Sequence, residues 1–136
     1  MDRRIFLASS IALIAASPAL AANGKAYRKG LVEAELAAGK TVFVDFYTDW
    51  CSTCRAQGTK IRKLMAANPA YEANISFIKV DWDLHSGSAL ASRLNIPRRS
   101  TLVVLKGDQE LGRIVASTST DKIKALMDTA LSAAVA

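Results

Sequence analysis

The sequence predicts an α/β fold in which a mixed central β-sheet of about four strands is flanked by helices on both faces. Segments with apolar residues at helical spacing alternate with short β-branched and aromatic segments, in the order αβαβαββα. A strand, a helix and a second strand in succession favour parallel pairing through a right-handed crossover, and a hairpin near the C-terminus adds an antiparallel edge. The 136 residues, 51% of them hydrophobic, are enough for one compact domain with its own core.

The first 21 residues have the pattern of an export signal, which leaves residues 22–136 for the folded domain. Arg3 and Arg4 precede an apolar run that is shorter than the roughly 20 residues needed to span a bilayer, and small residues precede a cleavage site after Ala21. We therefore expect a cleaved signal and a periplasmic protein. An uncleaved anchor is the alternative. The paired arginines are similar to a twin-arginine signal, and the choice between that route and general secretion stays open.

In the first half of the domain we expect a helix, a strand and a second helix. Apolar residues at helical spacing over residues 27–38 stop at Gly39, a common residue after a helix end. The run at residues 41–47 is apolar on both faces except for Asp45, as in a central strand that is covered on two sides. Helical spacing returns over residues 51–67 and ends before a proline.

The second half of the domain is expected to add a strand, a short helix, a hairpin and a final helix. Apolar and β-branched runs, a proline after the short helix and a Gly-Asp pair between the last two strands indicate these elements. Their expected ranges are 75–81, 86–94, 102–105, 111–115 and 120–134.

Residues 44–54 carry the motif with the strongest functional signal. They read V-D-F-Y-T-D-W-C-S-T-C, in which a strand-like run leads to the chain's two cysteines, Cys51 and Cys54. Asp45 lies six positions before Cys51, and Trp50 directly precedes it. On these residues the chain resembles thioredoxins over most of the expected domain. The resemblance implies a thioredoxin fold and a redox-active disulfide between Cys51 and Cys54, with no other cofactor and no metal.

The spacing of the two cysteines suggests separate roles. A thiol at a helix N-terminus has its pKa lowered from about 8.5 toward 7 or below, because backbone N–H groups and the helix dipole stabilise the thiolate. We therefore expect Cys51 to be the exposed nucleophile that forms a mixed disulfide with a client protein. Cys54, one helical turn further on and shielded, then attacks Cys51 and releases the reduced client.

Two further residues are catalytic candidates. Asp45 lies on the strand beneath the cysteines, where burial should raise the pKa of its carboxyl and allow it to accept the Cys54 proton. The resemblance to thioredoxins places Lys79, on the neighbouring strand, close to this acid. The alternative for each is an ordinary charged side chain in water.

Five residues are expected to contact the client: Trp50, Ser52, Thr53, Arg99 and Ser100. Trp50 is interpreted as a partly exposed platform beside the nucleophile. Arg99 brings positive charge that stabilises a thiolate or guides an acidic partner.

At Ser100 the chain departs from the thioredoxin pattern. Thioredoxins have a cis-proline before the Thr-Leu pair of the strand that faces the cysteines, and here Ser100 precedes Thr101 and Leu102. We expect a cis Arg99–Ser100 bond, although for a residue other than proline it costs about 2.5–4 kcal/mol more than trans. In an alternative alignment Pro97 takes this place, at the cost of a three-residue insertion.

The predicted function is that of a periplasmic thiol–disulfide oxidoreductase that passes electrons from a membrane thiol donor to client proteins with disulfides. The reductant direction rests on Asp45, on Lys79 and on the absence of histidine between the cysteines. A metal or iron–sulfur carrier is one alternative, and it needs a dimer because Cys51 and Cys54 give only half of a tetrahedral sulfur site. A redox-inert binding domain is the other.

The charge pattern argues against nucleic acid as a partner. The formal net charge is +6, but the basic residues are scattered and are not interleaved with aromatic residues. We expect a monomer that binds other proteins.

Overall fold

The computed structural model describes residues 24–136, and the expected export signal lies outside the described residues. This part of the chain contains five strands: β1 (Lys25–Ala26), β2 (Thr41–Tyr47), β3 (Ile75–Asp81), β4 (Thr101–Lys106) and β5 (Gln109–Val115). Its six helices are α1 (Leu31–Ala37), α2 (Ser52–Ala67), α3 (Ala70–Asn74), α4 (Trp82–His85), α5 (Ala89–Arg93) and α6 (Thr120–Val135). Within residues 24–136 no helix is both long and apolar enough to cross a membrane.

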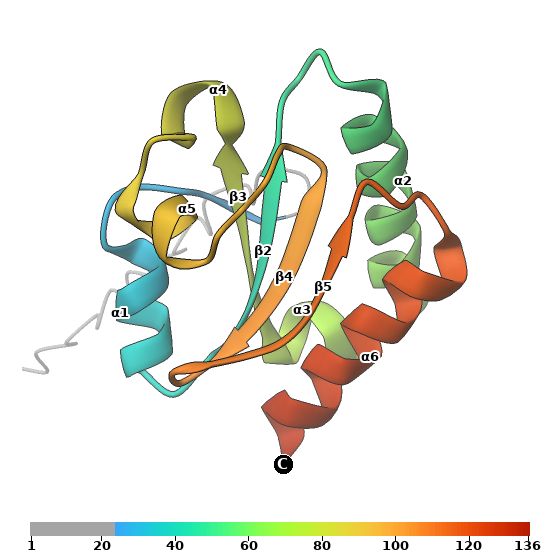
Figure 1. Ribbon diagram of the computed structural model, residues 1–136. Helices are drawn as coiled ribbons and strands as arrows, with labels where there is room; N and C mark the ends of the chain where they lie inside the picture. The colour runs from blue at the N-terminus through green and yellow to red at the C-terminus, as the bar shows by residue number, and fades with distance from the viewer. Residues whose placement is uncertain (1–23) are drawn as a thin grey trace, which may run out of the picture.

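The strands form one sheet in the order β1-β3-β2-β4-β5. β1, β3 and β2 are parallel, whereas β4 pairs antiparallel with β2, and β5 pairs antiparallel with β4. Figure 1 shows α1 and α5 on one side of the sheet and α2 and α6 on the other. The predicted mixed sheet with helices on both faces is therefore confirmed, with a fifth strand that the sequence pattern did not indicate.

Strand β2 shows how the sheet separates two hydrophobic cores. Successive side chains of a strand point to opposite faces, and all but the last residue of β2 are buried. Val42, Val44 and Phe46 pack into the core under α1 and α5. Phe43 packs into the core under α2 and α6. Asp45 lies two positions after Phe43, so its side chain is on the same face of the sheet, the one that carries α2.

The first helix is shorter than predicted, because the chain pairs with the sheet before the helix begins. The prediction placed a helix over residues 27–38, whereas residues 25–26 form β1 beside β3. Tyr27 extends this pairing by donating its backbone N–H to the carbonyl oxygen of Lys79 at 2.8 Å. Gly30 then turns the chain into α1 with a φ of 86°, a conformation that glycine adopts without strain.

The middle of the chain contains more short helices than predicted. The helix predicted over residues 86–94 is the shorter α5, and α4 precedes it, separated by Ser86, Gly87 and Ser88. The Ser88 hydroxyl accepts the backbone N–H of Ala91 at 3.1 Å and so caps α5 as a separate helix. Pro69 was expected only to end the preceding helix, but it is also the residue that caps the start of α3.

The predicted hairpin is present as β4 and β5, and the final helix predicted over residues 120–134 is α6. The register of β5 against β4 shifts between Val104 and Leu105, which interrupts the regular pairing. β5 forms an outer edge of the sheet, and its Arg113 makes an ion pair with Glu110 of the same strand.

Candidate active site

The two cysteines lie at the start of α2, just beyond the C-terminal end of the central strand β2 (Figure 1). Cys51 is the capping residue of α2, with an extended backbone and a sulfur that accepts the backbone N–H of Cys54 at 3.2 Å. Both cysteines are free thiols. The Cys51 sulfur is therefore held against the N–H groups at the positive end of the helix.

Neither thiol is exposed, so the expectation of an exposed Cys51 is wrong. Cys51 is 4% and Cys54 is 5% accessible to solvent. The segment before β4 covers the sulfurs, because the Ser100 hydroxyl lies 3.2 Å from Cys51 Sγ and 3.0 Å from Cys54 Sγ. The expected contact between Ser100 and the cysteines is thus present, and it explains the burial.

The surroundings of the two thiols shift their pKa values in opposite directions. Burial acts to raise the pKa of Cys51, but hydrogen bonds from the Cys54 thiol, the Ser100 hydroxyl, the Cys54 N–H and the Arg99 side chain outweigh it and lower the pKa to about 6. Burial raises the pKa of Cys54, and the hydrogen bond to Cys51 raises it further. At neutral pH Cys51 is therefore a thiolate and Cys54 a thiol, an arrangement that fits a nucleophilic and a resolving cysteine.

Alkylation should distinguish the two thiols. With limiting iodoacetamide at pH 7, the label is expected on Cys51 before Cys54, because only the thiolate reacts and the pKa of Cys51 is about 6. Mass spectrometry of proteolytic peptides locates the label, and a Cys51→Ser variant is the control, which should label far more slowly. Labelling of Cys54 first would show that the assigned roles are wrong.

Ser100 follows a different backbone path from the one expected. No peptide bond in residues 24–136 is cis, so the predicted cis Arg99–Ser100 bond is wrong, and Ser100 has a φ of 63°. A serine keeps the N–H that a proline lacks, and this N–H donates to the carbonyl oxygen of Phe46 at 2.7 Å. The Ser100 carbonyl oxygen accepts the N–H of Ala116 at 2.9 Å. Pro97 is exposed, so the alternative alignment that placed it against the cysteines is also wrong.

Gln57 is a site residue that the sequence analysis missed. It follows Cys54 by three positions on α2 and is completely buried. Its Nε2 donates to the carbonyl oxygens of Ser100 at 3.1 Å and of Ser117 at 2.9 Å. Gln57 therefore ties α2 to the segments on both sides of the β4–β5 hairpin. Only its place one turn after Cys54, on the same helix face, could have identified it.

Asp45 is buried as predicted, on the face of the sheet that carries α2. It is 4% accessible, and its Oδ1 has no hydrogen-bond partner. Burial raises the pKa of its carboxyl, Lys79 partly opposes this and Cys51 adds to it, with a resulting pKa of about 7. Lys79 pairs with Asp45 in the register of β2 and β3, and its Nζ lies 3.9 Å from the centre of the Tyr47 ring.

A cavity of about 290 Å³ connects these groups. Asp45, Cys54 and Lys79 all line it, and so does Thr48, whose buried hydroxyl has no hydrogen-bond partner. The exposed Arg55 also lines the cavity, which therefore reaches the surface along α2. A proton from Cys54 can pass by this route to Asp45 or to water.

Trp50 stands at the surface beside the thiols and is 60% exposed, as expected for a platform. Its Nε1 donates to Asp83 Oδ2 at 2.8 Å, and the Arg99 guanidinium lies 4.2 Å from its ring centre. Ser52 is exposed and Thr53 is half-buried in the first turn of α2. No pattern in the sequence indicates Asp83, which orients Trp50 from α4.

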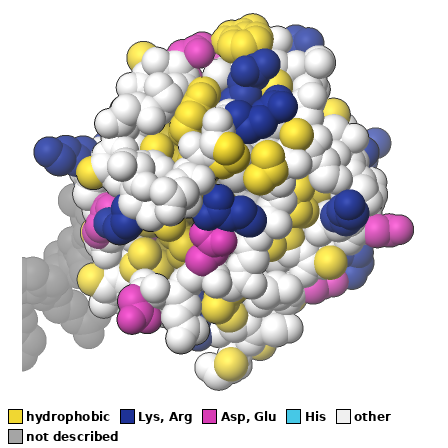
Figure 2. Space-filling model, in the orientation of Figure 1, with side chains coloured by type: hydrophobic (Ala, Val, Ile, Leu, Met, Phe, Trp, Pro, Cys, Tyr) yellow, Lys and Arg dark blue, Asp and Glu magenta, His cyan; other side chains and the backbone are white. Residues whose placement is uncertain are grey.

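The surface at this end of the molecule combines hydrophobic and basic side chains. Figure 2 shows Lys and Arg side chains beside hydrophobic ones over the β2–α2 loop and the segment before β4. Trp50 and Arg99 lie in these two segments. An exposed aromatic ring with a guanidinium over it offers contact area and positive charge to a polypeptide segment.

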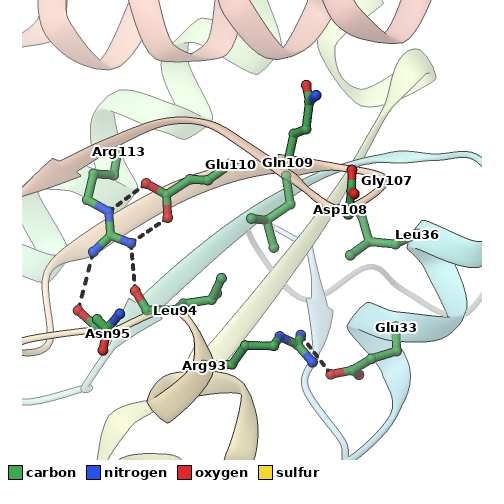
Figure 3. Close-up of a pocket in the computed structure, with 11 residues that line it drawn as sticks. Glu33, Leu36, Arg93, Leu94, Asn95, Gly107, Asp108, Gln109, Glu110 and Arg113 are labelled. Carbon is green, nitrogen blue, oxygen red and sulfur yellow. Dashed lines mark hydrogen bonds and ion pairs between the residues drawn. The ribbon is translucent and has the colours of Figure 1, made fainter.

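A larger cavity, of about 590 Å³, lies at the other end of the sheet, between α1, α5 and the β4–β5 turn (Figure 3). Four of its charged side chains are engaged in pairs: Arg93 pairs with Glu33 at 3.1 Å, and Arg113 pairs with Glu110. None of the predicted site residues lines it. The chemistry therefore belongs to the cysteine end of the molecule.

The cysteines lack the neighbours that a metal centre within one chain would need. In residues 24–136 no group of three or more His, Cys, Asp or Glu side chains is placed to hold a metal ion. Cys51 and Cys54 by themselves supply two of the four ligands of a tetrahedral sulfur site.

Comparison with known sequences identifies relatives of the chain. The family model described as Thioredoxin matches residues 21–129. The mitochondrial Thioredoxin-2 of Schizosaccharomyces pombe is 35% identical over 80 residues, which are 59% of this chain and 56% of that protein. Thioredoxin-2 of Pyricularia oryzae is 32% identical over 88 residues, or 65% of this chain and 47% of that protein. The matched segment thus spans about half the length of these relatives.

Solved structures with a similar fold include Trxlp from Edwardsiella tarda and thioredoxin F from spinach chloroplast. The first is 28% identical with a TM-score of 0.64, and the match covers 75% of this chain and 96% of that one. The second is 26% identical with a TM-score of 0.63, and the match covers 82% of this chain and 89% of that one.

Proposed function

The chain belongs to the thioredoxin family, and from this premise we propose that it is a thiol–disulfide oxidoreductase that reduces disulfides of client proteins through Cys51 and Cys54. The observation that carries the proposal is the asymmetry of the pair. The pKa of Cys51 is lowered to about 6, because hydrogen bonds at the start of α2 outweigh its burial, whereas burial raises the pKa of Cys54. Cys51 is therefore the thiolate that can attack a disulfide, and Cys54 remains protonated until the resolving step.

The proposed reaction has two displacement steps. The Cys51 thiolate attacks one sulfur of the client disulfide, which forms a mixed disulfide and releases the other client sulfur as a thiolate. Cys54 gives its proton to Asp45 or to water in the adjoining cavity, and its thiolate attacks Cys51 Sγ. The Cys51–Cys54 disulfide forms and the second client thiolate leaves, so two electrons have passed to the client.

The pKa of Cys51 is lowered only to about 6, which supports a reductant. A stabilised thiolate favours the reduced form of a dithiol and so makes the disulfide a stronger oxidant. The nucleophilic cysteine has a pKa of about 7 in reducing thioredoxins and about 3.5 in a strongly oxidising bacterial relative. The value of about 6 for Cys51 lies nearer to the reducing type.

The proposal includes a periplasmic location, a membrane-embedded thiol donor and a monomeric protein. The basic start, short apolar run and small residues before Ala22 support export. A protein that reduces disulfides outside the cytoplasm needs a source of electrons, and a membrane protein that exchanges thiols can supply them. The exposed Trp50 and its neighbour Arg99 provide a surface for both partners.

Equilibration with glutathione tests the proposed function. The protein is incubated at a series of ratios of reduced to oxidised glutathione, and its free thiols are then trapped by alkylation. Mass spectrometry counts the trapped thiols in each sample. We expect one two-electron transition with a potential nearer to about −270 mV than to about −120 mV. Catalysed reduction of insulin by dithiothreitol is the second readout.

Two variants sharpen this test. Cys54→Ser should accumulate a mixed disulfide with insulin chains or glutathione, because the second displacement is lost, whereas Cys51→Ser should not. A potential near −120 mV would identify an oxidant instead. If no Cys51–Cys54 disulfide forms at any glutathione ratio, the chain is a redox-inert binding domain.

A further inference from the structure

We propose that Ser100 is a catalytic residue whose hydroxyl donates its one hydrogen bond to the two cysteines in turn. It donates to Cys51 in the resting dithiol and to Cys54 in the mixed disulfide. This inference rests on the proposed function and adds to it a third side chain in contact with the reacting sulfurs.

The first support is the position of the hydroxyl oxygen between the sulfurs. Ser100 Oγ lies 3.2 Å from Cys51 Sγ and 3.0 Å from Cys54 Sγ, and Ser100 is completely buried. A hydroxyl has one proton to donate and lone pairs that can accept. It can therefore donate to only one sulfur at a time, and rotation about the C–O bond is enough to change which one.

The second support is the fixed backbone. The Ser100 N–H is bound to the Phe46 carbonyl oxygen at 2.7 Å, and the Ser100 carbonyl oxygen accepts from Ala116 at 2.9 Å and from Gln57 at 3.1 Å. These three bonds hold a φ of 63°, which is uncommon for a residue other than glycine. Such strain persists only where surrounding contacts over-determine it, and it is concentrated at functional sites.

The third support is that the other donors at the site are dedicated to one sulfur. The Cys54 backbone N–H donates to Cys51 Sγ at 3.2 Å. The Thr48 backbone lowers the pKa of Cys54. In the described part of the chain, Ser100 is the one residue outside the pair whose side chain is within hydrogen-bond distance of both sulfurs.

The hydroxyl follows the negative charge through the reaction. In the resting dithiol Cys51 is the thiolate and accepts the hydrogen bond of the Ser100 hydroxyl, while the protonated Cys54 thiol can donate a hydrogen bond to Ser100 Oγ. Once Cys51 has attacked the client, its sulfur is a neutral disulfide atom and no longer attracts the hydroxyl.

The hydroxyl then turns to Cys54. The Cys54 proton leaves to Asp45 or to water, and the thiolate is stabilised by Ser100 until it attacks Cys51 Sγ. That attack forms the Cys51–Cys54 bond, breaks the bond between Cys51 and the client, and releases the client thiolate, which takes a proton from solvent. Ser100 gains and loses no atom in the cycle.

The test measures the pKa of each thiol with and without the hydroxyl. Ser100→Gly removes the hydroxyl and accepts the positive φ, and Ser100→Ala is a second variant that also keeps the backbone N–H. The pH dependence of iodoacetamide labelling gives the pKa of Cys51. A Cys51→Ala background, in which Cys54 stands alone as it does in the mixed disulfide, gives the pKa of Cys54.

We expect each of the two pKa values to rise by about one unit, which is a tenfold loss of thiolate at a pH below both values. Ser92→Ala, an exposed serine on α5, is the matched control and should change neither value. A rise at Cys51 with no change at Cys54 would overturn the shared role, and so would unchanged values at both. Melting curves of the two Ser100 variants show that the folded proteins are being compared.

These titrations need no turnover, so the two proposals can fail separately. If the parent protein forms no disulfide with glutathione but both pKa values rise in the Ser100 variants, the proposed function fails and the assignment of Ser100 stands. If the parent is an active reductant and neither pKa value changes, the proposed function stands and the assignment of Ser100 fails.

Discussion

Ser100→Pro is expected to lower the free energy of unfolding by about 3 kcal/mol or more. Proline fixes φ near −65°, whereas Ser100 has a φ of 63°. It also removes the N–H that donates to the Phe46 carbonyl oxygen at 2.7 Å, which leaves a buried acceptor unpaired. Urea denaturation followed by circular dichroism measures the loss, with the same slope expected for parent and variant.

Ser100→Gly is the matched control for this experiment. Glycine keeps the N–H and accepts the positive φ, so the glycine variant should lose only the contacts of the Ser100 hydroxyl with the two sulfurs and stay clearly more stable than the proline variant. Thioredoxins have a proline at the corresponding position, and the substitution would look conservative from the family pattern alone. A proline variant as stable as the glycine variant would mean that the segment before β4 follows a backbone path different from the one described.

Asp45→Asn is expected to remove a large pH-dependent loss of stability. Burial above all, opposed by Lys79 and reinforced by Cys51, raises the pKa of Asp45 from 3.8 to about 7 in the folded protein. Because the folded state binds this proton more tightly than the unfolded state, the contribution of Asp45 to stability is greatest below pH 3.8 and is lost as the pH rises through about 7. The difference corresponds to roughly 4 kcal/mol at pH 8.

The comparison is made at a series of pH values in urea. The variant should match the parent near pH 4 and exceed it by several kcal/mol at pH 8, with roughly 4 as the upper bound. Cys51 titrates in both proteins, so the difference between them at each pH reports the ionisation of Asp45 together with its coupling to Cys51. Equal pH profiles would show that Asp45 is ionised and satisfied in the folded protein.

The same variant tests the proposed role of Asp45 in resolution. Without a carboxylate to accept the Cys54 proton, the mixed disulfide should decay more slowly at pH 7, while the first attack by Cys51 keeps its rate. Stopped-flow mixing with a fluorescent disulfide peptide separates the two steps. A variant that is more stable but equally fast would leave Asp45 with no part in the chemistry.

The strands that the sequence predicts most accurately are those with a clear pattern. Residues 41–47 and 75–81 form long β-branched runs, and both strands have the predicted bounds. Residues 25–26 cannot show a period of two, so β1 could be found only from its pairing with β3. Pro69 ends one helix and begins another because proline is excluded from helix interiors and tolerated in the first turn, and the sequence pattern indicates only the first of these effects.

At the site, the arrangement of residues close together in sequence could be predicted. The arrangement of residues that only tertiary contacts bring together could be predicted less well. Cys51, Cys54 and Asp45 belong to one strand and the helix that follows it, so their arrangement is local. The sign of φ at Ser100 depends on whether Phe46 lies within reach of its N–H, which no local pattern encodes. Gln57 looks like any polar helix residue until the loops that it binds are in place.

The edges of the sheet bear on how copies of the protein meet each other. An outer strand with free N–H and C=O groups can recruit a strand from a second molecule, which is a common start of aggregation. Here β1 has only two residues, and β5, the other edge, carries charged side chains and is displaced from regular pairing near Val104 and Leu105. Neither edge is a long, flat and apolar template. The proposed binding of client segments at the cysteine end therefore does not depend on adding a strand to the sheet, and the short or charged edges support the proposed monomer.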